Sequence, residues 1–381
     1  MKNLEKLKVK KISGLKVEEW SEYFPKDFAM KNSFLTNVFK LCTLFILISG
    51  SLAHYDSAYF RNSKDGFTTK SKWMNNIRDS VKLSEIAIPG THDSGSHTGK
   101  TDMVDTQCMN FQQQLDFGIR FFDIRVRHIG NGFALHHGVV YLGLVFNNFL
   151  DAAQSFLNNN PSEVVLFRIR KEHTDGDGNT RSMRDTLAAY LKNYNRYLKT
   201  SDSSITLDSA RGKFIILSDY SEFNEFGINY GNMDKQDNYN LGTNWDLYGK
   251  WESINQQLAK ALSGNNDQLY GNFLSGSGGS FPYFVASGHT SSGTSASRLS
   301  TGRTSVLWRN SYPDFPRVNC FLGTCTIAFE GTNILTRNKL QNYNSQMRQG
   351  KKSRTVGIII ADFPGDSLIQ TIIDNNYWIS K

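Results

Sequence analysis

The chain has 381 residues, of which 39% are hydrophobic and 20% charged, and its formal net charge is +8. This composition supplies enough apolar residues for one large core and excludes an intrinsically disordered chain. Lysine and arginine form no long runs and no RNA-binding signature occurs, so we expect no nucleic-acid partner.

The first 53 residues are typical of a leader rather than of a core. A basic segment precedes the apolar run of residues 41–48, and a small-x-small pattern ends at Ala53. The run is too short to cross a bilayer as a helix, but it suits the apolar centre of a secretory signal peptide. We therefore expect cleavage at Ala53 and a secreted protein, with Met30 preferred over Met1 as the start. A signal anchor or a buried amphipathic segment is the alternative.

Three of the four cysteines lie beyond this leader. In an oxidising compartment, Cys320 and Cys325 are spaced to close a small loop, which leaves Cys108 as a buried thiol. The spacing is not that of a zinc site, which requires paired Cys-x-x-Cys or Cys/His ligands.

A short segment, residues 54–71, leads into a region in which apolar runs alternate with helical patterns, at the spacing of repeated β-α units. We expect strands over residues 84–89, 120–127, 134–137, 164–170, 213–219, 268–274, 326–329 and 356–362. We expect helices over residues 111–117, 145–158 and 182–198. Residues 276–325, which begin rich in Gly and Ser, are expected to form an insertion over one end.

Polar residues recur at the carboxyl ends of many of these strands. A closed parallel barrel fits this recurrence better than an open sheet, whose polar residues gather at one switch point. We therefore predict an α/β fold, a TIM-type (β/α)8 barrel in a single domain over residues 72–381.

The polar strand ends carry a set suited to phosphodiester chemistry. The set consists of His92, Asp93, Asp123, Arg125, His137, Arg170, Glu172 and Asp362. Two histidines with carboxylates and a guanidinium meet the needs of in-line cleavage. One imidazole takes a proton from the nucleophile, the other protonates the leaving oxygen, and the arginine offsets phosphoryl charge. A single histidine is more often a structural residue, so the joint pattern carries this prediction.

Six of these eight residues, all except Arg170 and Glu172, lie in four of five recognisable motifs. The motifs occupy residues 88–95, 122–125, 135–141, 161–163 and 361–362. Together they resemble the X domain of phosphatidylinositol-specific phospholipase C in its small bacterial form. The resemblance runs from Lys72 to the C-terminus and is interrupted near residues 288–325. It implies a distorted TIM barrel that cleaves phosphatidylinositol, free or glycosylated, to diacylglycerol and a cyclic inositol phosphate.

The resemblance also implies roles for the two histidines. His92 is the general base that deprotonates the inositol 2-hydroxyl, and Asp362 orients it. His137, assisted by Asp93, is the general acid that protonates the diacylglycerol oxygen.

The same resemblance places Arg125, supported by Asp123, on the phosphate. Family members that use calcium have an acidic ligand where Arg125 stands, and a fixed guanidinium can replace the cation. We therefore predict that the enzyme uses neither a metal nor another cofactor.

The inositol-binding positions match less completely. Glu172, Asp246 and Tyr248 match the bacterial pattern, and Arg170 stands where that pattern has a lysine. Asp219 replaces an arginine that hydrogen-bonds the sugar, which leaves the headgroup preference open. Asp219 either contacts the headgroup or bridges to Arg170.

The expected partner is a phosphatidylinositol-containing membrane, and we expect the enzyme to act as a monomer. Met103 and Phe281 are placed to expose apolar side chains on the rim of the active-site mouth. Two other functions remain open: a metal-dependent glycerophosphodiesterase-like barrel, and a non-catalytic lipid- or glycan-binding barrel. Activity in excess EDTA and turnover of phosphatidylinositol vesicles distinguish the three.

Overall fold

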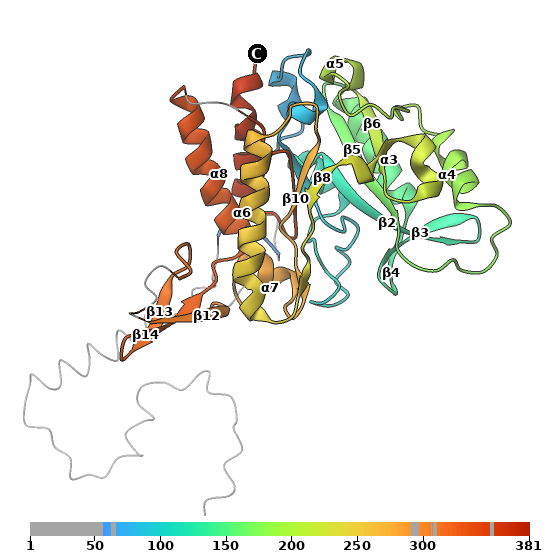
Figure 1. Cartoon of the computed structure of the whole chain (residues 1–381). Coiled ribbons are helices and arrows are strands. Elements are labelled where there is room, and N and C mark those ends of the chain that lie inside the picture. Colours follow the sequence, from blue (N-terminus) through green and yellow to red (C-terminus); the bar gives the residue numbers. More distant parts are fainter. Residues whose placement is uncertain (1–55, 62–65, 291–296, 306, 308–310, 351–353) are drawn as a thin grey trace, which may run out of the picture. The chain divides into compact units, whose positions relative to one another are not determined.

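The computed structural model describes residues 56–61, 66–290, 297–305, 307, 311–350 and 354–381 (Figure 1). The expected leader and its cleavage point at Ala53 lie outside the described residues and stay predictions. Among the described helices, none combines the length and the apolar character needed to span a bilayer.

Parallel strands form the central barrel. These are β1 (Ile88–Thr91), β2 (Phe121–Ile129), β5 (Val164–Lys171), β6 (Lys213–Ser218), β7 (Ile228–Asn229), β8 (Asp234–Gln236), β10 (Tyr270–Phe273) and β15 (Ile358–Ala361). Their order around the sheet is their order along the chain, and β15 pairs in parallel with β1. Within the described part of the chain, only β7 and β8 lack a ladder between neighbours. The prediction of a distorted TIM-type barrel is confirmed, and this seam is its main irregularity.

The remaining strands lie outside the barrel. They are β3 (Gly132–His137), β4 (Val140–Val145), β9 (Asn240–Leu241), β11 (Ser277–Gly278), β12 (Ser300–Ser305), β13 (Arg317–Phe321) and β14 (Thr324–Ala328). β3 and β4 continue from β2 as antiparallel hairpins, and β9 pairs with β11. The strands β12, β14 and β13 form a separate antiparallel sheet, which we call the small sheet.

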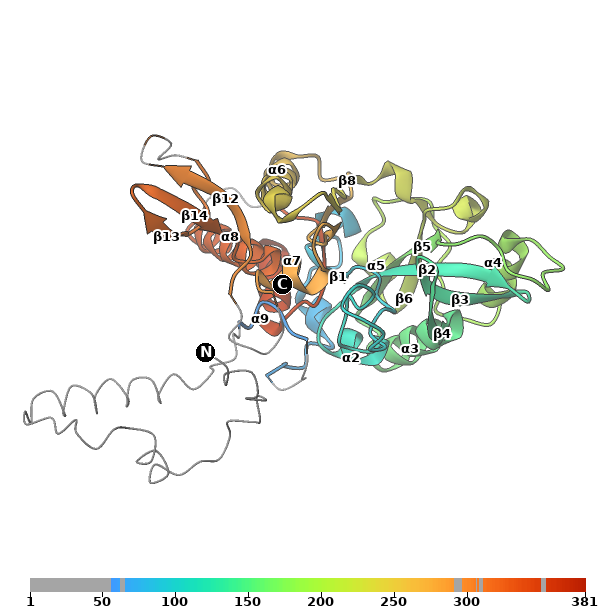
Figure 2. The same ribbon diagram turned by 90° about the horizontal axis from the view of Figure 1, so that it is seen from below.

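Helices cover the barrel on its outer side (Figure 2). The α-helices are α2 (Phe111–Asp116), α3 (Phe146–Asn159), α4 (Met183–Leu191), α5 (Leu207–Ala210), α6 (Leu247–Ser263), α7 (Pro282–Ser287), α8 (Thr332–Arg348) and α9 (Asp366–Asp374). The 3-10 helices are η2 (Trp73–Asn76), η3 (Leu83–Glu85), η4 (Ser221–Phe226), η5 (Tyr230–Asn232), η6 (Asn244–Asp246) and η8 (Asn375–Ile379).

Four expectations for single elements are wrong. The strand expected over residues 134–137 is β3, which pairs antiparallel to β2 outside the barrel, and the helix expected over residues 182–198 ends at Leu191. The strand expected over residues 326–329 is not part of the barrel, because β14 pairs with antiparallel neighbours on both sides. Cys108 is half-buried rather than buried, and its thiol donates to the Phe60 carbonyl. The disulfide between Cys320 and Cys325 is formed, as expected, and it joins β13 to β14.

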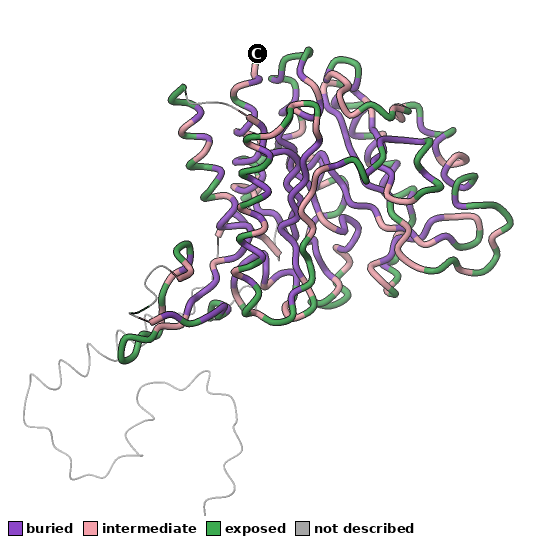
Figure 3. The backbone as a smooth tube through the Cα atoms, in the orientation of Figure 1, coloured by how far each residue is buried: buried purple, intermediate pink, exposed green. Residues whose placement is uncertain are grey.

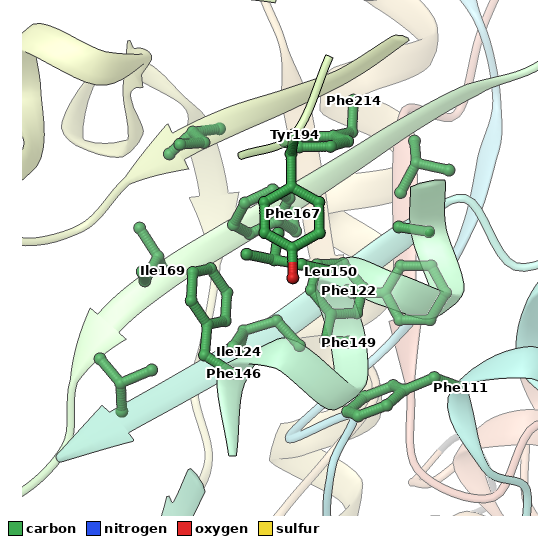
Figure 4. Packing of buried hydrophobic residues seen from close by; sticks show 14 of the residues in the cluster. Phe111, Phe122, Ile124, Phe146, Phe149, Leu150, Phe167, Ile169, Tyr194 and Phe214 are labelled. Atoms are coloured by element: carbon green, nitrogen blue, oxygen red, sulfur yellow. The ribbon is translucent and has the colours of Figure 1, made fainter. Parts of the chain in front are cut away.

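Most of the barrel strands are buried along almost their whole length (Figure 3). Side-chain alternation along them sets the two faces of the barrel wall. Phe121 and Leu166 belong to the cluster that fills the barrel, whereas their neighbours Phe122 and Phe167 pack against the helices. Figure 4 shows this outer cluster, in which the Phe149 ring of α3 lies 5.1 Å from Phe122 and 5.0 Å from Phe167. Burying each such ring contributes about 1.5–3 kcal/mol. A slip of one residue would turn these rings into the barrel interior, which the other cluster already fills, so their packing fixes the register of the strands.

Candidate active site

The same alternation brings the polar strand ends to one place. Asp123 and Arg125 follow Phe121 on the inner face of β2, and Arg168 and Arg170 follow Leu166 on β5, because side chains two residues apart share a face. These ends surround a cavity of about 280 Å³. Its lining residues are His92, Arg125, His137, Gly138, Arg170, Glu172, Asp237, Tyr239, Ser275, Gly276, Ser277, Pro282 and Asp362.

His92 lies between a carboxylate and a guanidinium. Its Nδ1 is 2.8 Å from Asp362 Oδ1, and its Nε2 is 2.7 Å from an Arg125 terminal nitrogen. Since arginine can only donate, Nε2 carries the lone pair and Nδ1 carries the proton. Burial disfavours a charged ring, but the Asp362 carboxylate outweighs it and raises the pKa of His92. The ring is thus held as a base with its lone pair toward the cavity.

Arg125 is the charged centre of the site. It contacts Asp123 at 3.1 Å and Glu172 at 3.2 Å, and its second terminal nitrogen lies 3.7 Å from Asp93. Burial favours the protonated form of Asp123, but Arg125 and Arg168 hold the pKa of this carboxyl well below its usual range. Asp123 is therefore a fixed anion that keeps the guanidinium in place.

His137 also faces the cavity, on the other side of Arg125. Its Nδ1 donates to the Val104 carbonyl at 2.7 Å and lies 3.5 Å from Asp93 Oδ2. That Asp93 oxygen is buried without a hydrogen bond, and burial raises the pKa of this carboxyl although Arg125 and His137 oppose the shift. The nearest acceptor for His137 is therefore a backbone oxygen, and Asp93 acts on the ring as a nearby charge.

The neighbouring His136 points away from this cavity, because it does not line it although His137 does. Its ring packs against Tyr141, with ring centroids 5.7 Å apart, and against His173. The motif therefore contains one histidine for the cavity and one for the packing of the β3–β4 hairpin.

Asp219 pairs with Arg168, not with Arg170. Its Oδ2 accepts from Arg168 Nε at 2.9 Å, while a second Arg168 nitrogen reaches Asp123 at 3.2 Å. The Arg168 guanidinium also lies over the Tyr230 ring, 4.5 Å from its centroid. Sequence reasoning missed Arg168, although a buried arginine two residues before Arg170 in the same strand requires such partners.

The segment expected to hold inositol lies elsewhere. Asp246 accepts from the backbone nitrogens of residues 242 and 243, and Tyr248 packs on Tyr312 and Phe315. Neither lines the cavity, so their placement in the site is wrong. A second Asp-x-Tyr motif, Asp237-Asn238-Tyr239, follows β8 directly and does line it. An Asp-x-Tyr motif directly after a strand was the sequence signal that could have identified this part of the site.

The two residues expected on the rim are exposed. Met103 is 67% exposed and Phe281 is 37% exposed. The Phe281 ring packs edge-on against Phe284, and the adjacent Tyr283 is buried. Both exposed side chains belong to segments that follow barrel strands, β1 and β10.

Comparison with known proteins agrees with this geometry. The family model for the X domain of phosphatidylinositol-specific phospholipase C matches residues 86–220. The 1-phosphatidylinositol phosphodiesterase of Staphylococcus aureus (strain NCTC 8325 / PS 47) is 32% identical over 275 residues, 63% of this chain and 80% of the relative. The protein of that name from Listeria monocytogenes is 28% identical over 268 residues, 65% of this chain and 82% of the relative.

Solved structures give the same result. A phosphatidylinositol-specific phospholipase C from S. aureus superimposes with a TM-score of 0.58 at 26% identity, covering 81% of this chain and 97% of that one. The Listeria monocytogenes enzyme has the same fold, with a TM-score of 0.57 at 23% identity, over 81% of this chain and 99% of that one.

Fold and site together define an α/β-barrel enzyme that cleaves phosphodiesters. The chain belongs to the family of phosphatidylinositol-specific phospholipases C.

Proposed function

We propose that the chain is a secreted, metal-independent phospholipase C that cleaves phosphatidylinositol, free or glycosylated, to diacylglycerol and a cyclic inositol phosphate. The observation that carries this proposal is the arrangement around Arg125. His92, hydrogen-bonded to Asp362 and Arg125, and His137, hydrogen-bonded to Val104, line one cavity, which Arg125 also lines.

In the proposed reaction, the inositol 2-hydroxyl oxygen attacks phosphorus while His92 Nε2 takes its proton. The bond from phosphorus to the diacylglycerol oxygen breaks, and that oxygen receives a proton from His137 Nε2. The negative charge on the phosphoryl oxygens faces Arg125, which exchanges its contact with His92 for one with the phosphate. Water then opens the cyclic product in a second step, in which the two histidines exchange roles.

The absence of a metal is part of the proposal. Arg125 fills the place between Asp93, Asp123 and Glu172 where a cation would otherwise neutralise the carboxylates. Within the described ranges, no group of three His, Cys, Asp or Glu side chains is placed to hold a metal ion.

We propose that Asp237 and Tyr239, with Arg170 and Glu172, hold the inositol ring. All four line the cavity that contains the two histidines. Asp219 is engaged by Arg168, so in this assignment it orders the wall of the site and does not contact the headgroup.

The proposed partner is a phosphatidylinositol-containing membrane, approached by the enzyme as a monomer. Met103 and Phe281 are exposed apolar side chains on segments that leave the barrel at its carboxyl end, which suits contact with a lipid surface. We also propose that residues 1–53 are removed when the protein is exported.

The test is hydrolysis of phosphatidylinositol vesicles with and without excess EDTA. We expect equal rates in both, because Arg125 replaces the metal, whereas a glycerophosphodiesterase-like enzyme would lose activity with the chelator. His137→Ala should lower kcat about 10²–10⁴-fold, as removal of a general acid does. His136→Ala, one residue away, is the matched control and should turn over at a rate close to that of the parent. A dead His136→Ala enzyme beside an active His137→Ala enzyme would exclude the assignment.

A further inference from the structure

The small sheet is firmly seated on the barrel. The Tyr248 ring lies edge-on to Tyr312 at 4.8 Å and to Phe315 at 5.1 Å. Trp251 Nε1 of α6 donates to Asp314 Oδ2 at 2.8 Å, just beside these rings in the sequence. Because these contacts fix the base of the sheet, the hairpin formed by β13 and β14 has a set position relative to the barrel.

The tip of this hairpin is apolar and exposed. Phe321 is 75% exposed and Leu322 is 87% exposed. Phe321 pairs with Thr324, so the turn consists of Leu322 and Gly323, both with positive φ, at 45° and 78°. The disulfide between Cys320 and Cys325 closes the hairpin directly behind the turn. We call Phe321 and Leu322 the hairpin tip.

The hairpin tip does not serve the fold. Two-residue turns with positive φ favour Asn and Gly, and a leucine there is unfavourable, since its Cβ crowds the backbone. Exposing two large apolar side chains next to each other is also unfavourable in water. The chain retains both features on a hairpin that a disulfide holds rigid, which is what a surface shaped for an apolar partner requires.

Position and charge point to a membrane as that partner. The small sheet lies at the end of the molecule where α7 lies, away from the C-terminus (Figure 1). Pro282, the first residue of α7, lines the catalytic cavity, and the small sheet follows α7 in the chain. Among the described residues of the range 300–328, the charged side chains are Arg303, Arg317 and Asp314, and Asp314 is bound to Trp251. A net positive surface with an apolar tip complements an anionic lipid surface.

We propose that the hairpin tip inserts into the interfacial region of the bilayer that contains the substrate, as a second membrane contact beside the rim residues Met103 and Phe281. This inference rests on the proposed function in one respect: the substrate is a membrane lipid. The tip holds the enzyme on the surface and takes no part in the chemistry.

The test is co-sedimentation of the full chain with vesicles of phosphatidylcholine, with and without phosphatidylinositol. The double variant Phe321→Ser/Leu322→Ser should bind at least about tenfold more weakly, the low end of what the loss of two partly buried apolar side chains causes. Tyr377→Ser is the matched control. Tyr377 is 58% exposed and four residues from the C-terminus, and the C-terminus lies at the opposite end of Figure 1 from the small sheet, so the loss of this side chain should leave binding unchanged.

Turnover of a water-soluble inositol cyclic phosphate separates this inference from the proposed function. The double variant should match the parent on that substrate. If the parent cleaves neither phosphatidylinositol in vesicles nor the soluble inositol cyclic phosphate, the proposed function fails. The vesicle assay still decides the role of the hairpin tip, because it measures binding and not turnover. Unchanged vesicle binding of the double variant would overturn the inference. The inference would also be overturned if the double variant loses self-association in sedimentation velocity while its vesicle binding is unchanged. The tip would then be a contact between copies of the chain.

A second measurement uses the tip as a probe. In Leu322→Trp, brominated lipids should quench the added fluorescence, because the side chain enters the interface. In Tyr377→Trp, the added fluorescence should be unaffected. Equal quenching in the two variants would contradict insertion of the tip.

Discussion

At the scale of single residues, the site depends on which group donates a hydrogen bond to the lone pair on His92 Nε2. Arg125 donates to Nε2 at 2.7 Å in the free enzyme, so an incoming hydroxyl must displace this contact. A phosphate that binds the Arg125 guanidinium would displace this contact and leave His92 Nε2 free to accept a proton. This contact holds the His92 lone pair toward the cavity until the substrate arrives, which is the orientation that the proposed general base requires.

The variant Asp362→Asn tests the orientation of this base. Burial acts to lower the pKa of His92 and the Asp362 charge raises it, so removing the charge should move this pKa downward. The base must be neutral to act; hence the acid limb of kcat/KM should shift to lower pH. The maximal rate should also fall, by about 10²-fold or more, because the amide no longer fixes the tautomer. A pH–rate profile on a soluble substrate measures both effects. Identical profiles for variant and parent would remove Asp362 from the mechanism.

The sequence identified side chains of this site more readily than backbone groups. His92, Arg125 and Asp362 stand in motifs of recognisable order, and alternation along a strand then brings them together. The Val104 carbonyl that holds His137 has no sequence signature, since any residue offers a carbonyl. The inositol segment was misplaced for a different reason: two Asp-x-Tyr motifs occur within twelve residues, and only the fold shows which of them faces the cavity.

At the scale of elements, the amino end of the barrel is held by a buried ion pair. Arg120, just before β2, and Glu163, just before β5, are both fully buried and 2.9 Å apart. Arg120 also donates to the carbonyls of Leu115 and Ile119, and Glu163 accepts from the backbone nitrogen of Met74. The motif of residues 161–163 is therefore structural, since it joins three segments at the end of the barrel opposite the site.

Glu163→Gln should destabilise the fold without changing the chemistry. The amide removes the charge that compensates Arg120, and breaking one partner of a buried pair costs about 3–5 kcal/mol. Urea denaturation should show this loss as a lower midpoint with an unchanged slope, while kcat/KM of the folded enzyme stays at the parental value. Loss of activity without loss of stability would instead place Glu163 in the catalytic machinery.

Of the three longest helices in the described part of the chain, the one with a regular apolar face was predicted and the two with an interrupted face were missed. α3 buries six apolar side chains at helical spacing, and its range was expected almost in full. α6 buries Lys250 and Gln257 among its apolar residues, and α8 buries Asn333 and Asn344, so polar residues interrupt the pattern in both helices. Burial of polar groups depends on partners far away in the chain, which a local pattern does not reveal.

At the scale of the whole molecule, the barrel follows from a simple repetition. Its strands lie in chain order around the ring, so each neighbour in sequence is a neighbour in space. The seam escaped prediction because β7 has two residues and β8 has three, too few to show a period. The small sheet escaped prediction as a sheet because β13 is mostly exposed and shows no apolar period, although a strand over residues 326–329 and the disulfide between β13 and β14 were expected.

Lys250 sets a pH dependence on the stability of the whole barrel. Its side chain on α6 is buried, its Nζ donates to Gln236 Oε1 at 3.1 Å, and Asp237 and Asp362 are the nearest charges. Burial lowers the pKa of Lys250 from 10.5 to about 7, which these carboxylates only partly oppose. Between these two values the unfolded chain binds a proton that the folded chain does not. Stability therefore rises with pH across this window, and the penalty is complete below pH 7.

Lys250→Met should remove this dependence. A methionine has a similar length, and Gln236 Oε1 keeps the Asn238 backbone nitrogen as a donor at 2.6 Å. Relative to the parent, the free energy of unfolding should increase most near pH 7, by at most about 5 kcal/mol, and the increase should vanish toward pH 10.5. Denaturation at a series of pH values measures this, with Lys260→Met, exposed on the same helix, as the control that keeps the parental slope. If the free energy of unfolding of Lys250→Met depends on pH as in the parent, Lys250 is charged in the folded barrel. Only a lysine that is neutral in the folded state couples proton binding to unfolding in this pH range.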